Sequence, residues 1–283
     1  MAEEVKRTHR YHAEATVLHG DLYHPLVQEI KPQTNVKLAD VGGYLSEHAE
    51  PYRLEGVISF SKAYTQVAGN PDPKEGHGWS TLSTSVVENL NVLEVVTADR
   101  IVGQIATDYP PEGYVPKVHF LGTRFENLRI AGHPVELDIH PDPSFLGEKP
   151  DNDGPYTRHR PLLDRLEEQF ERIRRGDGVP DKITQRYNGV SSTSDGVESI
   201  ECSLVSKAEG PYPGLSWGHV IHIPGFGYIH LAVLKIVHSD YDKEKRVWKK
   251  TLFDLKMLEL EMGCIGGGRA MLVNPVTNGS TEP

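Results

Sequence analysis

Apolar residues recur at every second position along most of this chain, the spacing at which side chains share one face of a β-strand. The pattern is clear in VKLAD, SIECSLVS, VIHIPGFGYIHLAVLKIV and PVELDIH, where Val, Ile, Thr and Tyr are abundant. The chain's 27 glycines and 20 prolines interrupt these runs at short intervals. Many short strands separated in this way predict a mainly β fold, an antiparallel β-sandwich or a barrel-like structure.

The alternation changes phase once near the C-terminus. Residues 253–257 place apolar side chains on alternate positions, and residues 258–262 do so in the opposite phase. The change falls between Met257 and Leu258. A β-bulge, or a strand that passes from one sheet to another, would produce it.

One segment, RPLLDRLEEQFERIRRGDG, has the period of an amphipathic helix instead. Pro161 suits the first turn of a helix, and Gly176 suits its end. We therefore expect one helical insert in an otherwise β-rich chain. The apolar face of this helix consists of Leu162, Leu166, Phe170 and Ile173.

The strands on both sides of the insert are expected to build a single β-rich domain over residues 15–275, with the insert at residues 151–197. The part that follows the insert has few strands for a core of its own and would leave an open sheet edge. Residues 1–14 and 276–283 are expected to be terminal tails.

Two stretches of the chain repeat one pattern: VVENLNVLEVV, from Val86, and RFENLRIAGHPV, from Arg124. Glu88 and Glu126 are 38 residues apart (126 − 88), and both are followed by Asn-Leu, a polar residue and a β-branched residue. Either a duplicated strand pair or independent convergence on good strand chemistry explains this pattern. Two copies do not make a solenoid, which needs at least three.

The stretches TSVVENLNVLEVVTADRIVGQI and FLGTRFENLRIAGHPV, about a quarter of the chain, resemble bacterial β-rich modules of the choice-of-anchor kind. The shared features are a Thr-Ala-Asp turn and a strand end with the pattern Leu-x-Ile/Val-x-Gly-x-Pro. Such modules are usually secreted or surface-attached and have no assigned activity. The resemblance implies a sandwich-like structural or adhesive role and supplies no catalytic residues. This chain departs from those modules because we find no signal peptide or anchor in it.

Composition narrows the class of protein further. The chain has 283 residues and a net charge of −10, which argues against a general nucleic-acid binder because such proteins need clustered Lys and Arg. No run of about 18 apolar residues could form a transmembrane helix. The charged start MAEEVKRTHRYHAE lacks the apolar core of a secretory signal, so the cytoplasm is the expected location, with signal-independent export left open. Cys202 and Cys264 are expected to be partly buried thiols, or one bridge in an oxidising compartment.

Histidines suggest one candidate metal site. His219, His222 and His230 flank a Pro-Gly-Phe-Gly turn that predicts a hairpin. A loop of two or four residues would place His222 and His230 on opposite faces, whereas an odd loop would place them across from each other and allow a metal ion. Asp138 and His140, with Asp142, form a second candidate set if the strand is extended. We expect no cofactor, unless these residues hold a divalent ion.

Four aromatic residues lie beside prolines or glycines in expected loops. Such residues bind sugars or protein partners when they are exposed, and otherwise they cap the end of a sandwich core. We expect either a ligand-binding role or this capping role for Tyr109, Tyr114, Tyr212 and Trp217.

The sequence therefore favours a non-enzymatic β-rich structural, assembly or ligand-binding protein. It would act through loop aromatics, or through edge strands shared with further copies of itself. A homo-oligomer, or a protein or carbohydrate partner, is expected. The alternative is a metal-dependent hydrolase or related enzyme that uses His219, His222, His230 and nearby acidic residues.

Overall fold

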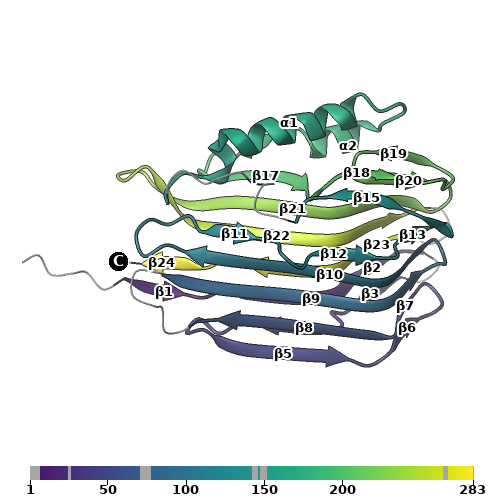
Figure 1. Cartoon of the computed structure of the whole chain (residues 1–283), viewed down its shortest axis with the longest axis horizontal. Helices are drawn as coiled ribbons and strands as arrows, with labels where there is room; N and C mark the ends of the chain where they lie inside the picture. The colour runs from purple at the N-terminus through teal and green to yellow at the C-terminus, as the bar shows by residue number, and fades with distance from the viewer. Residues whose placement is uncertain are drawn as a thin grey trace, which may run out of the picture.

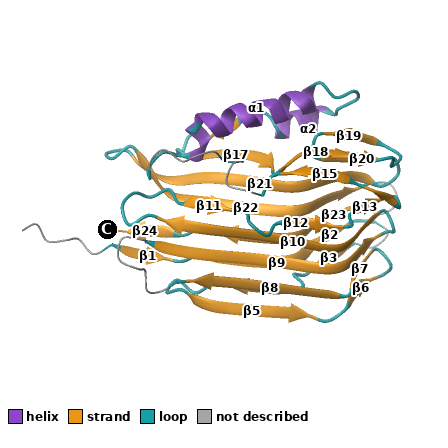
Figure 2. Ribbon diagram, in the orientation of Figure 1, coloured by secondary structure: helices purple, strands orange, loops and turns teal. Residues whose placement is uncertain are grey.

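The computed structural model describes residues 7–24, 27–70, 78–141, 146, 152–263 and 267–282. It contains two long antiparallel sheets that pack face to face, with helices along one side (Figure 1). Coloured by secondary structure, the molecule is almost entirely strand (Figure 2). The predicted mainly β, antiparallel sandwich is confirmed.

The first sheet, sheet A, is built by strands from both ends of the chain and so joins segments far apart in the sequence. Its main path runs β16-β17-β21-β22-β23-β2-β3. These strands are β16 (Val190–Ser192), β17 (Glu198–Ser203), β21 (Gly227–Asp242), β22 (Val247–Met262), β23 (Gly268–Thr277), β2 (Ala13–Leu22) and β3 (Gln28–Ile30). Shorter strands on its margins are β1 (Thr8–Arg10), β4 (Asn35–Lys37), β19 (Leu215–Trp217), β20 (Val220–Ile223) and β24 (Ser280–Glu282).

The second sheet, sheet B, is a meander of consecutive hairpins between residues 43 and 134. Its strands are β5 (Gly43–Ala49), β6 (Tyr52–Leu54), β7 (Ile58–Phe60), β8 (Lys62–Gly69), β9 (Trp79–Val92), β10 (Val96–Tyr109), β11 (Lys117–His119), β12 (Arg124–Glu126), β13 (Arg129–Ile130) and β14 (His133–Pro134). A separate two-stranded sheet pairs β15 (Glu136–Ile139) with β18 (Val205–Glu209).

The core lies between the sheets and is one continuous cluster. It includes Val17 near the N-terminus, Ile101 in sheet B, Phe170 in the helical insert and Leu272 near the C-terminus, all almost fully buried. Each sheet presents every second side chain inwards, so the period-two pattern of the sequence becomes the inner face.

The predicted change of phase in β22 is confirmed. Leu231 pairs with Leu258 and Val233 with Lys256, and the register is interrupted between these pairs. Met257 and Leu258 are both buried. Ala232, opposite the interruption, has a φ of 46°. This local irregularity moves apolar residues to the same inner face on both sides of it.

The helical insert contains the predicted helix and a second one. Helix α1 (Arg160–Arg174) carries Pro161 in its first turn and buries the four predicted apolar residues. A short 3₁₀ helix (Tyr156–Arg158) precedes it, and helix α2 (Asp181–Arg186) follows it. Gln169 fixes α1 to the sheet, because its side chain accepts a hydrogen bond from Ser203 N and donates to Ser203 O, both at 3.0 Å. The six residues of α2 are too few to show a periodic pattern.

The expected terminal tails are strands. Thr8–Arg10 and Ser280–Glu282 pair with each other in antiparallel register, and Ala13–Leu22 forms a central strand of sheet A. The polar segments 1–14 and 276–283 look like tails in the sequence because their pairing partners lie at the opposite end of the chain.

The two similar stretches occupy equivalent positions. Glu88 on β9 and Glu126 on β12 both lie opposite Arg100, on the two sides of β10. The residues Thr97–Asp99, expected to form a turn, lie within β10. The turn between β9 and β10 falls earlier, at Leu93 and Glu94, which both have positive φ.

Among the described residues, no helix is long and apolar enough to cross a membrane.

Candidate functional site

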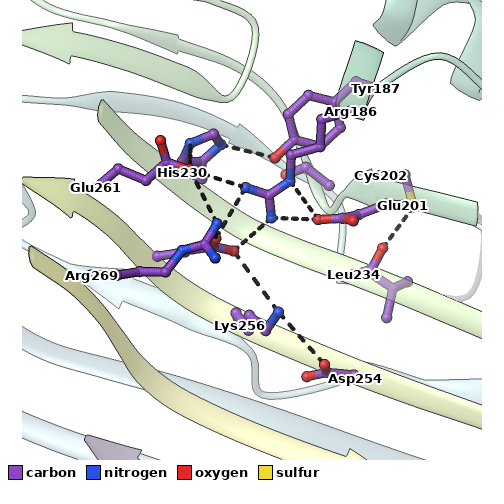
Figure 3. A network of polar contacts seen from close by, with 12 residues as sticks. Arg186, Tyr187, Glu201, Cys202, His230, Leu234, Asp254, Lys256, Glu261 and Arg269 are labelled. Carbon is purple, nitrogen blue, oxygen red and sulfur yellow. Dashed lines mark hydrogen bonds and ion pairs between the residues drawn. The ribbon is translucent and has the colours of Figure 1, made fainter. Parts of the chain in front are cut away.

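The largest cluster of charged side chains lies where α2 meets sheet A (Figure 3). Arg186, the last residue of α2, donates to Glu201 on β17 and to both oxygens of Glu259 on β22, at 3.0 and 2.6 Å. Glu259 is only 1% exposed. A buried carboxylate needs such a bidentate partner, because desolvation otherwise disfavours its charge.

The charges of this cluster are balanced. Burial alone would raise the pKa of Glu259, but the hydrogen bonds and charge of Arg186 lower it to about 2. Arg269 adds a further ion pair to Glu259 at 3.0 Å. The cluster contains four acidic residues, Glu201, Asp254, Glu259 and Glu261, and four basic residues, Lys182, Arg186, Lys256 and Arg269. Its carboxylates are therefore neutralised by side chains, which is the chemistry of a clamp between α2 and the sheet.

Two buried histidines lie beneath this clamp, next to Tyr187. Tyr187 Oη is 2.9 Å from His230 Nδ1, and the Tyr187 ring meets the edge of His219 with 4.5 Å between the ring centroids. Burial lowers the pKa of His230 to about 4 and lowers that of His219 further. Both rings are therefore neutral at pH 7. Neither nitrogen of His219 has a hydrogen-bond partner among the described residues.

The predicted histidine hairpin has an odd loop of three residues, 224–226. Ile223 pairs with Gly227, so His222 lies across from Tyr228, and His230 lies across from Val220. The odd loop puts His222 and His230 on one face, but two residues out of register with each other. His222 packs against Tyr228 with 4.8 Å between the ring centroids, while His230 is buried under α2. Within the described ranges, no group of three His, Cys, Asp or Glu residues could hold a metal ion.

Asp138 and His140 lie on the same side of β15, as the extended strand predicts. His140 Nε2 is 3.2 Å from Asp138 Oδ1, and both side chains are about half exposed. The third member of that set, Asp142, lies outside the described residues, as does Cys264. Cys202 is buried within sheet A, where burial raises the pKa of its thiol.

All four predicted aromatic residues have buried side chains. Tyr109 and Tyr114 lie near the two chain termini, where Tyr109 Oη accepts a hydrogen bond from Gly279 N at 2.7 Å. Tyr212 and Trp217 lie around β19, at the opposite end of the sandwich (Figure 1). The latter two line one cavity of about 330 Å³ together with Arg172, Lys207 and Ser216. Because their rings are packed inside, they present little aromatic surface to a ligand.

The most exposed ordered strand is β5, on the outer margin of sheet B. Six of its seven residues are exposed, and it pairs with β8 on one side. No described strand pairs with its other side, and Figure 1 shows no element beyond it. Tyr44 is 62% exposed, Leu45 is 46% exposed, and Val41 just before the strand is 78% exposed. Unpaired backbone groups next to exposed apolar side chains form a template for another strand.

The sequence did not single out this margin. The segment VGGYLSEHAEP alternates weakly, and whether a strand lies at an edge depends on the order of strands in the sheet. The one local signal is the pair Gly42-Gly43 before the strand and Pro51 after it, which isolates a short strand.

Comparisons with known proteins give one match. Residues 9–237 match the model of a family described as a domain of unknown function (DUF8256). No curated protein and no solved structure matches the chain.

Proposed function

We propose that this chain, which belongs to the DUF8256 family, is a non-enzymatic assembly module that associates with a second copy of itself through strand β5. The exposed outer side of β5 carries this proposal. Sheets in most proteins protect such a margin with charge, proline or a covering element, whereas β5 presents Tyr44 and Leu45 beside a single acidic residue, Glu47. The cytoplasmic location expected from the sequence stays a prediction.

The sequence of β5 is compatible with pairing to itself. In an antiparallel pair centred on Ser46, Tyr44 lies opposite His48 of the other copy, and Leu45 lies opposite Glu47. No charge then faces a like charge, and two aromatic cross-strand pairs form on one face. A two-fold axis through Ser46 makes the interface isologous, so association ends at the dimer.

The other features are better explained by stability than by chemistry. The Arg186 cluster is neutralised by its own side chains, and the four predicted aromatic residues are buried in the sandwich. Neither arrangement opens a reactive group to a substrate. An assembly role needs only the rigid sandwich and one free margin.

The experiment is a charge test at the centre of the proposed pair. Light scattering of the wild-type protein should show a concentration-dependent dimer. Ser46→Lys and Ser46→Glu should each be monomeric, because like charges would meet across the two-fold axis. An equimolar mixture of the two variants should recover the dimer.

The matched control is Gln66→Lys, because Gln66 pairs with Ser46 on the neighbouring strand β8 and so lies away from the margin. This variant should dimerise as the wild type does. A wild-type protein that stays monomeric at millimolar concentration would overturn the proposal. So would a mixture of the Lys and Glu variants that fails to associate while the wild type does.

A further inference from the structure

Three tight turns of sheet B are equally spaced along the chain. Their central residues are Glu55-Gly56, Leu93-Glu94 and Ala131-Gly132, and all six residues have positive φ. The first residues of these turns are 38 apart (93 − 55 and 131 − 93). Two consecutive residues with positive φ define the turn that joins two-residue hairpins. The turns belong to the β6–β7, β9–β10 and β13–β14 hairpins, which lie in that order across the sheet.

The contacts between successive hairpins repeat at the same interval. Leu93 N donates to Val57 O at 2.8 Å, and 38 residues later Ala131 N donates to Val95 O at 2.7 Å. Strand register follows the same rule. The pairs Ile58–Val92, Ser59–Asn91 and Lys62–Glu88 become Val96–Ile130, Thr97–Arg129 and Arg100–Glu126.

A side-chain contact repeats as well. Asn89 Nδ2 donates to Ser61 Oγ at 2.8 Å, and Asn127 Nδ2 donates to Asp99 Oδ2 at 2.6 Å. Both asparagines have left-handed backbone conformations, with φ of 52° and 51°. Each contact joins one hairpin to the hairpin before it. Backbone bonds, register and a side-chain amide thus define one repeated interface.

The first hairpin has no neighbour before it, and its sequence differs at one position. The residue 38 positions before Asn89 is Pro51, which follows Glu50 as Asn89 follows Glu88. Proline fixes φ near −65°, so Pro51 cannot adopt the left-handed conformation, and it has no side-chain donor. The chain consequently breaks into β5 and β6 at this point, whereas β9 runs through the equivalent position without a break.

We infer that sheet B is a tandem array of three 38-residue hairpin units, and that the free side of β5 is the unused copy of the interface between units, taken by β5 of a second molecule. Gly43–Ala49 is equivalent to 81–87, the part of β9 that pairs with β8. Pro51 limits the free interface to this segment, because it removes the Asn contact and the pairing beyond it. The inference rests on the proposed self-association through β5 and adds the geometry and the extent of the contact.

The test restores the missing residue. Pro51→Asn gives the first unit the Glu-Asn sequence of the other two and is expected to tighten the dimer about tenfold, since it adds a hydrogen bond and lengthens the paired segment. Analytical ultracentrifugation measures the dissociation constant, and circular dichroism verifies the fold of each variant. Ser46→Lys in the Pro51→Asn background should return the protein to a monomer.

Pro51→Ala is the matched control, because it removes the proline without supplying the amide, and its dissociation constant should stay within about threefold of the wild-type value. A folded Pro51→Asn variant that dimerises no more tightly than the wild type would overturn the inference and leave the proposed function intact. Equal tightening by Ala and Asn would also overturn it, since the repeated amide contact would then be absent. If wild type and Pro51→Asn are both monomeric at all concentrations, the proposed function fails as well.

Discussion

Glu88 and Glu126 lie opposite the same residue, Arg100, from the strands on the two sides of β10. Lys62 lies opposite Glu88 from its other side, so acidic and basic side chains alternate across four neighbouring strands. Arg100 Nε is 3.9 Å from Glu88 Oε1, and Arg100 Nη2 donates to Tyr64 Oη at 3.1 Å. Opposite charges on adjacent strands stabilise one register over its alternatives.

The asparagine that follows each of these glutamates should be needed for its backbone conformation. Asn127→Ala is expected to lower the free energy of unfolding by about 1–2 kcal/mol, because the side chain of alanine disfavours the left-handed region. Asn127→Gly should cost clearly less, since glycine adopts that region freely. Urea unfolding followed by circular dichroism measures both. The same order is expected at Asn89, and equal losses for Ala and Gly would contradict the explanation.

The hydroxyl group of Tyr187 should stabilise the buried histidine beside it. Tyr187→Phe removes the only hydrogen bond that His230 makes among the described residues and leaves a buried imidazole without a partner. We expect a loss of about 1–3 kcal/mol in the free energy of unfolding. Tyr23→Phe is the control, because Tyr23 is 62% exposed, and it should change stability little. A Tyr187→Phe variant as stable as the wild type would show that the hydrogen bond contributes nothing.

Acid should weaken the clamp between α2 and sheet A through Glu259. The pKa of this carboxyl group is lowered to about 2 in the folded protein, so the unfolded chain binds its proton more tightly. The resulting stabilisation is present above about pH 4.5 and is lost as the pH falls towards 2. Glu259→Gln should therefore be less stable than the wild type by about 2–3 kcal/mol at pH 7, with a difference that shrinks below pH 4.5.

Urea unfolding at several pH values measures this difference, and Glu168→Gln on the exposed face of α1 is the control. A constant difference between the wild type and Glu259→Gln from pH 7 to pH 2.5 would contradict the assignment.

A second acid effect should come from His9, which is stacked on Trp79 and packed against Tyr109. Burial lowers the pKa of His9 to about 4. The unfolded chain, with a pKa near 6.5, therefore takes up the proton first, and stability falls as the pH drops from 6.5 to 4. His9→Phe should fit the aromatic cluster and reduce this loss by up to about 3 kcal/mol.

Thermal unfolding between pH 7 and pH 4 measures the effect, with His133→Phe at an exposed position as the control. Part of the loss should remain in His9→Phe, because burial also lowers the pKa of His219 and His230. An unchanged pH dependence would show that His9 does not titrate in this range.

The sequence by itself determined the strands of the core and the long helix. In β22 and α1, the period of the apolar residues fixes which face is buried, and even the change of phase at Met257 can be seen in the pattern. These features are local, because hydrophobic burial acts on each side chain according to its own position in a strand or helix turn.

The tertiary structure decided which segments become neighbours. The pairing of Thr8–Arg10 with Ser280–Glu282, the three-residue loop before Gly227 and the exposed margin at β5 depend on partners that the local pattern does not specify. The sequence showed two copies of the hairpin pattern, and the first unit became visible only through its turn and register, because Pro51 replaces the asparagine there. Arg186 and Glu259 likewise meet from segments 73 residues apart, where folding removes both from water and makes the ion pair matter.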